Sequence, residues 1–291
     1  MPWLQLKCAS HPQHVDAISD WLTAHGALSV TYQDAADQPL YEPPPGETPL
    51  WQDTIITGLF EAQTDLESLV RELPRHFTGV TGVRMEILED KDWVREWMSR
   101  YRPMQFGESL WIVPSHHAPP DPRAVNILLD PGLAFGTGTH PTTAMCLRWL
   151  ASHPPRSQAV VDYGCGSGIL AIAAAKLGAS HVIAVDNDPQ ALQATQYNAE
   201  QNHVSKYIEC RDVTPPLQTQ CDTLLANILA GPLISLAPRF AEIVRPGGNI
   251  VLSGILAEQA DSVRHAYAAW FDFQHTAQQE EWVLLNATHR L

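Results

Sequence analysis

The chain has 291 residues, which exceeds the size of most single domains and is enough for two domains that each bury a core. Its 18 lysine and arginine residues against 32 aspartate and glutamate residues give a formal net charge of -14. This charge argues against a general affinity for nucleic-acid phosphates or anionic membranes, and it suits a basic protein partner.

The five cysteines are scattered without a C-x-x-C pair, so the sequence indicates neither a disulfide framework nor a zinc ribbon. No secretion signal is recognisable, and no apolar run reaches about 18 residues, the length that suggests a membrane span. We expect a cytoplasmic protein, monomeric and without a bound metal.

The first 89 residues alternate short apolar runs with helix-like periodicity, interrupted by a proline-rich loop. The pattern predicts strands at residues 3–7, 28–32, 54–61 and 84–88 and helices at residues 12–25 and 65–77. The order β-α-β-β-α-β is that of a small ferredoxin-like α+β domain, in which two helices cover one face of a sheet.

Residues 90–109 are predicted to form a linker helix between two domains, residues 1–89 and 110–291. Trp93 and Trp97 lie four residues apart and therefore share one face of this helix. Two roles fit such a pair, packing between the domains or stacking on nucleic-acid bases. The acidic charge of the chain favours packing.

From about residue 110 onward, apolar strands and helices alternate. Strands are predicted at residues 160–162, 182–186, 223–226 and 250–253, and helices at residues 169–177, 189–202 and 233–243. Strands that are apolar on both faces indicate a parallel sheet with helices on both sides, so we expect a doubly wound, Rossmann-like α/β sheet. Residues 270–273 and 281–287 are predicted to add an antiparallel pair.

A glycine-rich turn follows the first of these strands. Asp162 ends the strand, and Gly164, Gly166 and Gly168 follow at alternate positions. Glycines here permit positive φ and allow the backbone to approach a ligand that a Cβ would keep away. The dinucleotide fingerprint is broken because Ile169 stands where a third glycine or alanine belongs, and no Gly-Lys-Ser/Thr phosphate loop follows.

The D-x-G-x-G-x-G pattern instead resembles motif I of class I S-adenosylmethionine-dependent methyltransferases, whose loop contacts the amino-acid part of the cofactor. Asp186 ends the next strand, 22 residues after Gly164, where a carboxylate can hold both ribose hydroxyls. The alternative is a tight strand-to-helix turn that binds no ligand.

A second glycine-rich loop, residues 135–143, leads into an apolar helix predicted at residues 144–150, and Pro141 suits the start of a helix. Thr142 and Thr143 offer hydroxyl and N–H groups at the positive end of the helix dipole. These groups can bind a cofactor carboxylate or simply cap the helix, and the residues alone leave both roles open.

Asn227 follows the strand predicted at residues 223–226, at the carboxyl end of the sheet where open α/β folds bind ligands. Its side-chain oxygen can orient an amine so that the nitrogen lone pair faces an electrophilic methyl group. The alternative is a turn residue that caps a helix. Methyltransferases of glutamine or adenine carry Asn/Asp-Pro-Pro-Tyr/Phe here, whereas this chain has Ile228 and Leu229, so the slot for a planar amide is missing.

Five longer strings are spread over nearly the whole chain. They are PGET at 45–48, EDKDW at 89–93, DPGLAFGTGTHPTT at 130–143, NILAGPL at 227–233 and LSGIL at 252–256. Together they resemble the bacterial methyltransferases of large-subunit ribosomal protein eleven. The third and fourth strings are the specific ones, since motif I is shared by many methyltransferases.

The resemblance implies an enzyme that transfers methyl groups from S-adenosyl-L-methionine to lysine side-chain and N-terminal amines of that ribosomal protein. It implies that Thr143, Gly164, Asp186 and Asn227 hold the cofactor, together with Gly166 and Gly168 of the same loop. Asn227 is also the expected catalytic residue, and the small N-terminal domain is expected to capture the protein substrate. Asn187 departs from the family, which commonly has an apolar residue after the ribose-binding acid.

Other chemistry has weaker support. His116, His117 and His140 lack a second ligand at metal-binding spacing and are expected to be solvated or capping residues, and Cys165 is expected to be a small packing residue. A nucleotide-dependent oxidoreductase and a non-catalytic module on the same fold remain as alternative functions, although the spacing at Ile169 weakens the first.

Overall fold

The computed structural model describes residues 3–36, 38, 49–88, 101–130 and 138–291. The chain divides into two compact units, residues 1–96 and 97–291. Most of the predicted linker helix, with Trp93 and Trp97, lies outside the described residues, as do the strings at 45–48 and 89–93. Within the part of the chain that is described, no helix is both long and apolar enough to cross a membrane.

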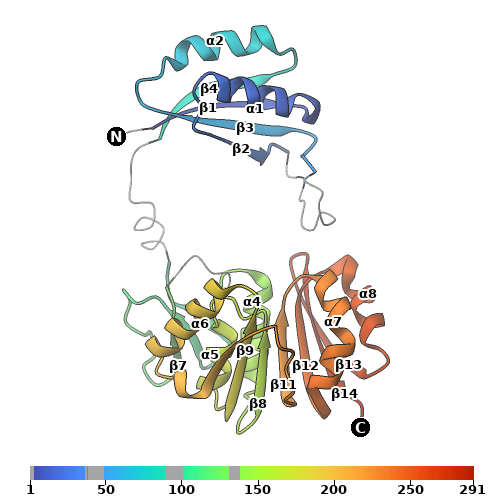
Figure 1. Ribbon diagram of the computed structural model, residues 1–291. Helices are drawn as coiled ribbons and strands as arrows, with labels where there is room; N and C mark the ends of the chain where they lie inside the picture. Colours follow the sequence, from blue (N-terminus) through green and yellow to red (C-terminus); the bar gives the residue numbers. More distant parts are fainter. Residues whose placement is uncertain (1–2, 37, 39–48, 89–100, 131–137) are drawn as a thin grey trace. The chain divides into compact units, whose positions relative to one another are not determined.

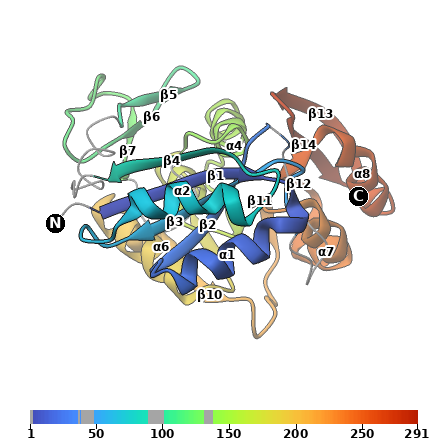
Figure 2. The ribbon, with the colours of Figure 1, turned by 90° about the horizontal axis from the view of Figure 1, so that it is seen from above.

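The N-terminal unit is a four-stranded sheet with two helices, and its elements occur in the predicted order. They are β1 (Trp3–Ser10), α1 (Val15–Ala24), β2 (Ser29–Asp34), β3 (Thr54–Phe60), α2 (Leu66–His76) and β4 (Thr81–Leu88), with a short 3-10 helix at Pro12–His14. The sheet order is β2-β3-β1-β4, and each neighbouring pair is antiparallel. Figure 2 shows both helices on the same face of this sheet.

The core of this unit follows from the alternation of side chains along its strands. Leu6 and Cys8 of β1 are buried in the same apolar cluster as Ile18 and Leu22 of α1 and Leu73 of α2. Two amphipathic helices therefore seal one face of the sheet.

The C-terminal unit is built on a seven-stranded sheet with the order β10-β9-β8-β11-β12-β14-β13. Its strands are β8 (Ala159–Tyr163), β9 (His181–Asp186), β10 (Ile208–Asp212), β11 (Cys221–Asn227), β12 (Val244–Leu256), β13 (Phe271–Gln279) and β14 (Trp282–His289). Neighbours from β10 to β12 are parallel, whereas β14 is antiparallel to both β12 and β13. The predicted antiparallel pair at the end of the chain is confirmed.

Helices cover both faces of this sheet (Figure 1), as predicted for a doubly wound fold. The helices are α4 (Pro141–Ser152), α5 (Ile169–Lys176), α6 (Pro189–Gln201), α7 (Ala230–Ile243) and α8 (Ala260–Tyr267). Successive strand residues enter different apolar clusters: Val160 and Leu225 lie in the cluster with α4 and α5, while Val161 and Leu224 lie in the cluster with α7 and α8. Strands that are apolar on both faces therefore have helices on both faces.

A small additional sheet was not predicted. It consists of β5 (Met104–Phe106), β6 (Leu110–Val113) and β7 (Val125–Leu128), in the order β5-β6-β7. The linker helix therefore does not continue to residue 109, because residues 104–106 pair with β6 as a strand. These strands are too short for periodicity to reveal them. Strand β10 was also missed, since its sequence Ile-Glu-Cys-Arg-Asp carries the charged side chains of an edge strand.

Candidate active site

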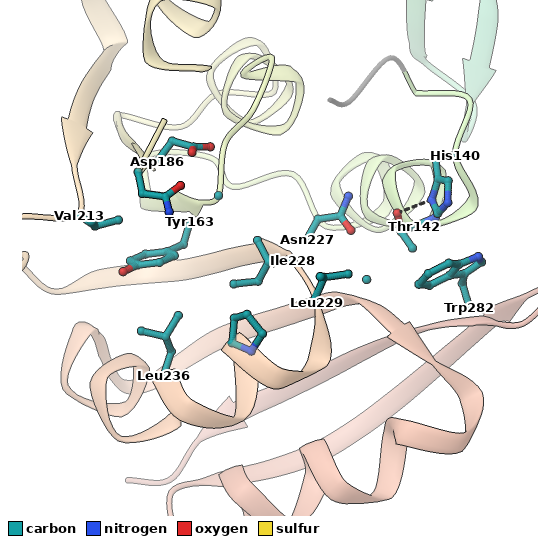
Figure 3. Close-up of a pocket in the computed structure, with 14 residues that line it drawn as sticks. His140, Thr142, Tyr163, Asp186, Val213, Asn227, Ile228, Leu229, Leu236 and Trp282 are labelled. Carbon is teal, nitrogen blue, oxygen red and sulfur yellow. Dashed lines mark hydrogen bonds between the residues drawn. The ribbon is translucent and has the colours of Figure 1, made fainter. Parts of the chain in front are cut away.

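The carboxyl ends of β8, β9 and β11 lie together because β8 pairs in parallel with both of the other strands. The strand order reverses at this point, which is where open α/β sheets bind ligands. A cavity of about 620 Å³ lies there, within the size range of small-molecule sites. The described residues that line it (Figure 3) are His140, Thr142, Tyr163, Gly164, Asp186, Asn187, Val213, Asn227, Ile228, Leu229, Pro232, Leu236, Gly254 and Trp282.

Three of the predicted cofactor residues, Gly164, Asp186 and Asn227, line this cavity together. The other three, Thr143, Gly166 and Gly168, are not among the described residues that line it. Thr143 and Gly166 hydrogen-bond to lining residues, and Gly168 is the N-cap residue of α5.

The loop after β8 has a shape that requires glycine. The φ angle is 79° at Gly164, 53° at Gly166 and 78° at Gly168, all in the left-handed region that other residues rarely adopt. A Cβ on Gly164 would overlap Cγ2 of Ile228. The Gly164 N–H donates to the carbonyl oxygen of Val185 at 2.7 Å, which ties the loop to β9.

The half-buried carboxylate of Asp186 holds the glycine loop and the start of the next helix. Its Oδ2 accepts a hydrogen bond from the Gly166 N–H at 2.9 Å, and its Oδ1 accepts one from the Asp188 N–H at 3.0 Å. Each carboxylate oxygen can accept a further hydrogen bond. Asp186 is therefore fixed in position and still able to bind a pair of hydroxyl groups.

Asp162 lies beneath the loop and is only 1% exposed. Its Oδ2 accepts from the N–H of Ala171 at 2.9 Å, in the first turn of α5, whose N-cap residue Gly168 has no side chain for this purpose. Burial raises the pKa of Asp162 to about 7, the Ala171 hydrogen bond opposes this, and the charge of Asp186 adds to it. From the sequence Asp162 was only the end of a strand, whereas in the structure it caps α5.

Asn227 is the last residue of β11 and connects that strand to α4. Its Nδ2 donates to Oγ1 of Thr143 at 3.2 Å. The bond sets the orientation of the amide, so that the carbonyl oxygen Oδ1 is the remaining acceptor, without a hydrogen bond to any described residue. Thr143, which the sequence left open between capping and cofactor binding, positions Asn227 here.

The start of α4 borders the cavity at the far side of Asn227 (Figure 3). His140 is the N-cap residue of α4, with Nδ1 3.4 Å from the N–H of Thr142 and 2.8 Å from its Oγ1. Burial lowers the pKa of His140, and the carboxylates of Glu280 and Glu281 partly oppose this effect. The expectation that His140 is a capping residue is confirmed.

Several lining residues were not found from the sequence. Gly254 belongs to the string at 252–256, and the sequence predicted no separate role for it, yet a Cβ there would overlap the carbonyl oxygen of Ile228. Tyr163, Val213 and Trp282 are apolar or aromatic, and in a sequence such residues cannot be distinguished from core residues.

Cys165 is a packing residue, as expected. It is 5% exposed, the hydroxyl of Thr195 donates to its Sγ at 3.3 Å, and burial raises the pKa of its thiol. A thiol in this environment is a poor nucleophile. Over the described ranges no group of three or more His, Cys, Asp or Glu side chains has an arrangement that could hold a metal ion.

Comparison with known proteins gives one consistent result. Residues 2–290 match the family described as "Ribosomal protein L11 methyltransferase (PrmA)". The ribosomal protein L11 methyltransferase of Marinobacter nauticus is 50% identical over 300 residues, covering 100% of this chain and 99% of the relative. That of Sodalis glossinidius is 52% identical over 293 residues, covering 100% of both chains. The solved ribosomal protein L11 methylase of Lactobacillus delbrueckii subsp. bulgaricus has a TM-score of 0.61 and 31% identity, covering 66% of this chain and 100% of that one.

Proposed function

Because the chain belongs to the ribosomal protein L11 methyltransferase family, we propose that it transfers methyl groups from S-adenosyl-L-methionine to amines of ribosomal protein L11. The amines in question are lysine side chains and the N-terminal amine. The observation that carries the proposal is the convergence of the glycine loop, Asp186 and Asn227 on one cavity at the reversal point of the sheet.

The described residues fit this cofactor. Gly164 offers a backbone without a Cβ for the amino-acid part, Asp186 offers acceptors for the ribose hydroxyls, and Asn187 borders the adenosine end. Thr143 and Gly166 support these contacts through Asn227 and Asp186, and Gly168 shapes the loop. When bound, S-adenosyl-L-methionine supplies an activated methyl group on a cationic sulfonium.

Asn227 is the residue that orients the amine in this proposal. Its Oδ1 accepts a hydrogen bond from the amine N–H and thereby directs the nitrogen lone pair toward the methyl group. Only a neutral amine can attack, and a lysine with a reference pKa near 10.4 is protonated at neutral pH. Burial in a largely apolar cavity favours the neutral form, and we assign the released proton to water.

We further propose that residues 1–89 form a ferredoxin-like domain that recognises the protein substrate, that residues 90–109 connect the domains, and that residues 110–291 hold the cofactor. The strand order β2-β3-β1-β4 with two helices on one face supports the first assignment. The described residues that line the cavity all lie beyond residue 110, which supports the third. The charge of -14 supports a basic protein partner without direct contact to nucleic acid or membrane, and we propose a cytoplasmic monomer.

The test is to incubate the full chain with ribosomal protein L11 and S-adenosyl-L-methionine and to map added methyl groups by mass spectrometry. We expect methylated amines on the ribosomal protein and thermal stabilisation of the chain by S-adenosylhomocysteine but not by NAD. Stabilisation without methyl transfer would favour a non-catalytic module, and stabilisation by NAD alone would favour an oxidoreductase.

A further inference from the structure

The cavity extends to both sides of Asn227. In Figure 3, Asp186 and Val213 lie on one side of Asn227, and Thr142, His140 and Trp282 lie on the other. The proposed function places the ribose at Asp186 and the reacting methyl group next to Asn227. The end formed by Thr142, His140 and Trp282, here named the acceptor end, is then where the substrate amine enters.

The charges around the acceptor end favour a cation. None of the described residues that line the cavity is a lysine or an arginine. Glu280 and Glu281, in the turn between β13 and β14, lie close enough to His140 for their charges to raise its pKa against the effect of burial. Both residues are exposed, so salt will screen the attraction that their charges exert on a cation near His140.

Trp282 is the aromatic wall of this end. It is 9% exposed and lines the cavity as the first residue of β14, where it pairs with Leu256 of β12 and Gln279 of β13. Its ring meets the His140 ring edge to face, with 5.0 Å between centroids and 67° between planes. Two strands and the N-cap of α4 therefore hold the ring in place.

An aromatic ring suits the chemistry of an amine that must lose its proton before attack. A carboxylate in contact with the amine would stabilise the ammonium form and raise its pKa. An aromatic ring also attracts the ammonium through its quadrupole, but more weakly than a carboxylate in contact, so it raises the pKa of the amine less. The ring has no lone pair that takes up the proton. The lining of the cavity agrees with this difference, because Trp282 is one of the described lining residues and Glu280 and Glu281 are not.

We propose that Trp282 is a substrate-binding residue of the acceptor end, where its ring holds the incoming amine and the methylated ammonium that each transfer produces. This inference rests on the proposed amine methylation. The ring retains a methylated product, because a methylated ammonium remains a cation while it loses N–H donors for Asn227.

The test compares the full chain with its Trp282→Phe and Trp282→Leu variants. Trp149→Leu is the matched control, since Trp149 is 8% exposed and is not among the described residues that line the cavity. With ribosomal protein L11 as substrate, Trp282→Leu should raise KM about five- to thirty-fold, and Trp282→Phe should retain most of the affinity. The affinity for S-adenosylhomocysteine should not change, which excludes a collapsed cofactor site.

A second measurement separates cation binding from simple packing. Two peptides serve as inhibitors, and both have the sequence around a lysine that the enzyme methylates. In the first peptide this lysine is trimethyllysine, and in the second a carbon atom replaces the ammonium nitrogen, which removes the charge. The wild type and Trp149→Leu should prefer the charged peptide several-fold, and Trp282→Leu should lose this preference. Equal inhibition by the two peptides, or inhibition by neither, in the wild type overturns the inference. A wild type that binds S-adenosylhomocysteine but methylates no amine overturns the proposed function instead.

Discussion

Replacement of Asp186 by alanine should weaken cofactor binding through the loss of hydrogen bonds to the ribose hydroxyls. A hydrogen bond to a charged group contributes about 1.5 to 3 kcal/mol, so the dissociation constant should rise about ten- to 150-fold. The structure predicts a second, smaller effect, because the N–H groups of Gly166 and Asp188 lose the carboxylate that accepts from them. Water can replace that acceptor, since the side chain is only half-buried.

Titration calorimetry can separate the two effects with S-adenosylhomocysteine and an analogue that lacks both ribose hydroxyls. The wild type should bind the analogue about ten- to 150-fold more weakly than S-adenosylhomocysteine, whereas Asp186→Ala should bind both ligands with the same affinity. A disturbed loop alone would weaken both ligands and preserve the difference between them. Asp188→Ala is the control, because Asp188 caps α6 through Gln190 and is not among the described lining residues. Unchanged affinity for S-adenosylhomocysteine in a folded Asp186→Ala variant would refute the assignment.

Three further predictions concern residues of the site and its loop, and a fourth concerns the N-terminal unit. Asn227→Ala should lower kcat by more than it weakens cofactor binding, and wild-type turnover at saturating cofactor and substrate would contradict this. Gly164→Ala should lower stability by about 1 to 3 kcal/mol in denaturant unfolding, because φ is 79° and the new Cβ overlaps Ile228; an unchanged midpoint would argue against the loop geometry. Since the folded pKa of Asp162 is raised from 3.8 to about 7, its contribution to stability is present below about pH 4 and is lost as pH rises toward 7. In the Asp162→Asn variant the free energy of unfolding should therefore fall less between about pH 4 and about pH 7 than in the wild type. An equally steep fall in the variant would show that burial does not penalise the charge of Asp162. A folded chain that begins at residue 90 should still bind S-adenosylhomocysteine but lose most methylation of ribosomal protein L11; an unchanged kcat/KM would mean that the N-terminal unit does not recognise the substrate.

Elements with strong local patterns were predicted well. Residues 182–186 were predicted as a strand and form most of β9, and residues 189–202 match α6 to within one residue. Local chemistry marks one boundary of each element. An acid and a turn end β9, and Asp188 with Pro189 starts α6. Strands β5 and β10 were missed because a three-residue strand has no measurable period and an edge strand carries polar side chains.

The sequence by itself determined the residues that make the turns of the site. Gly164 and Gly168 need positive φ within a single loop, and Asp186 ends the next strand along the chain, so local rules are sufficient to single them out. The resemblance supplied the family, which the comparisons then showed.

Only the tertiary structure decided how these residues act together. The amide of Asn227 is oriented by Thr143, which lies 84 positions earlier in the chain. Trp282 reaches His140 only because β14 inserts between β12 and β13, and this strand order is not encoded in local periodicity. The physical reason is that propensity and pattern act over a few residues, whereas the cavity is formed by contacts between segments that only the packing of the whole sheet brings together.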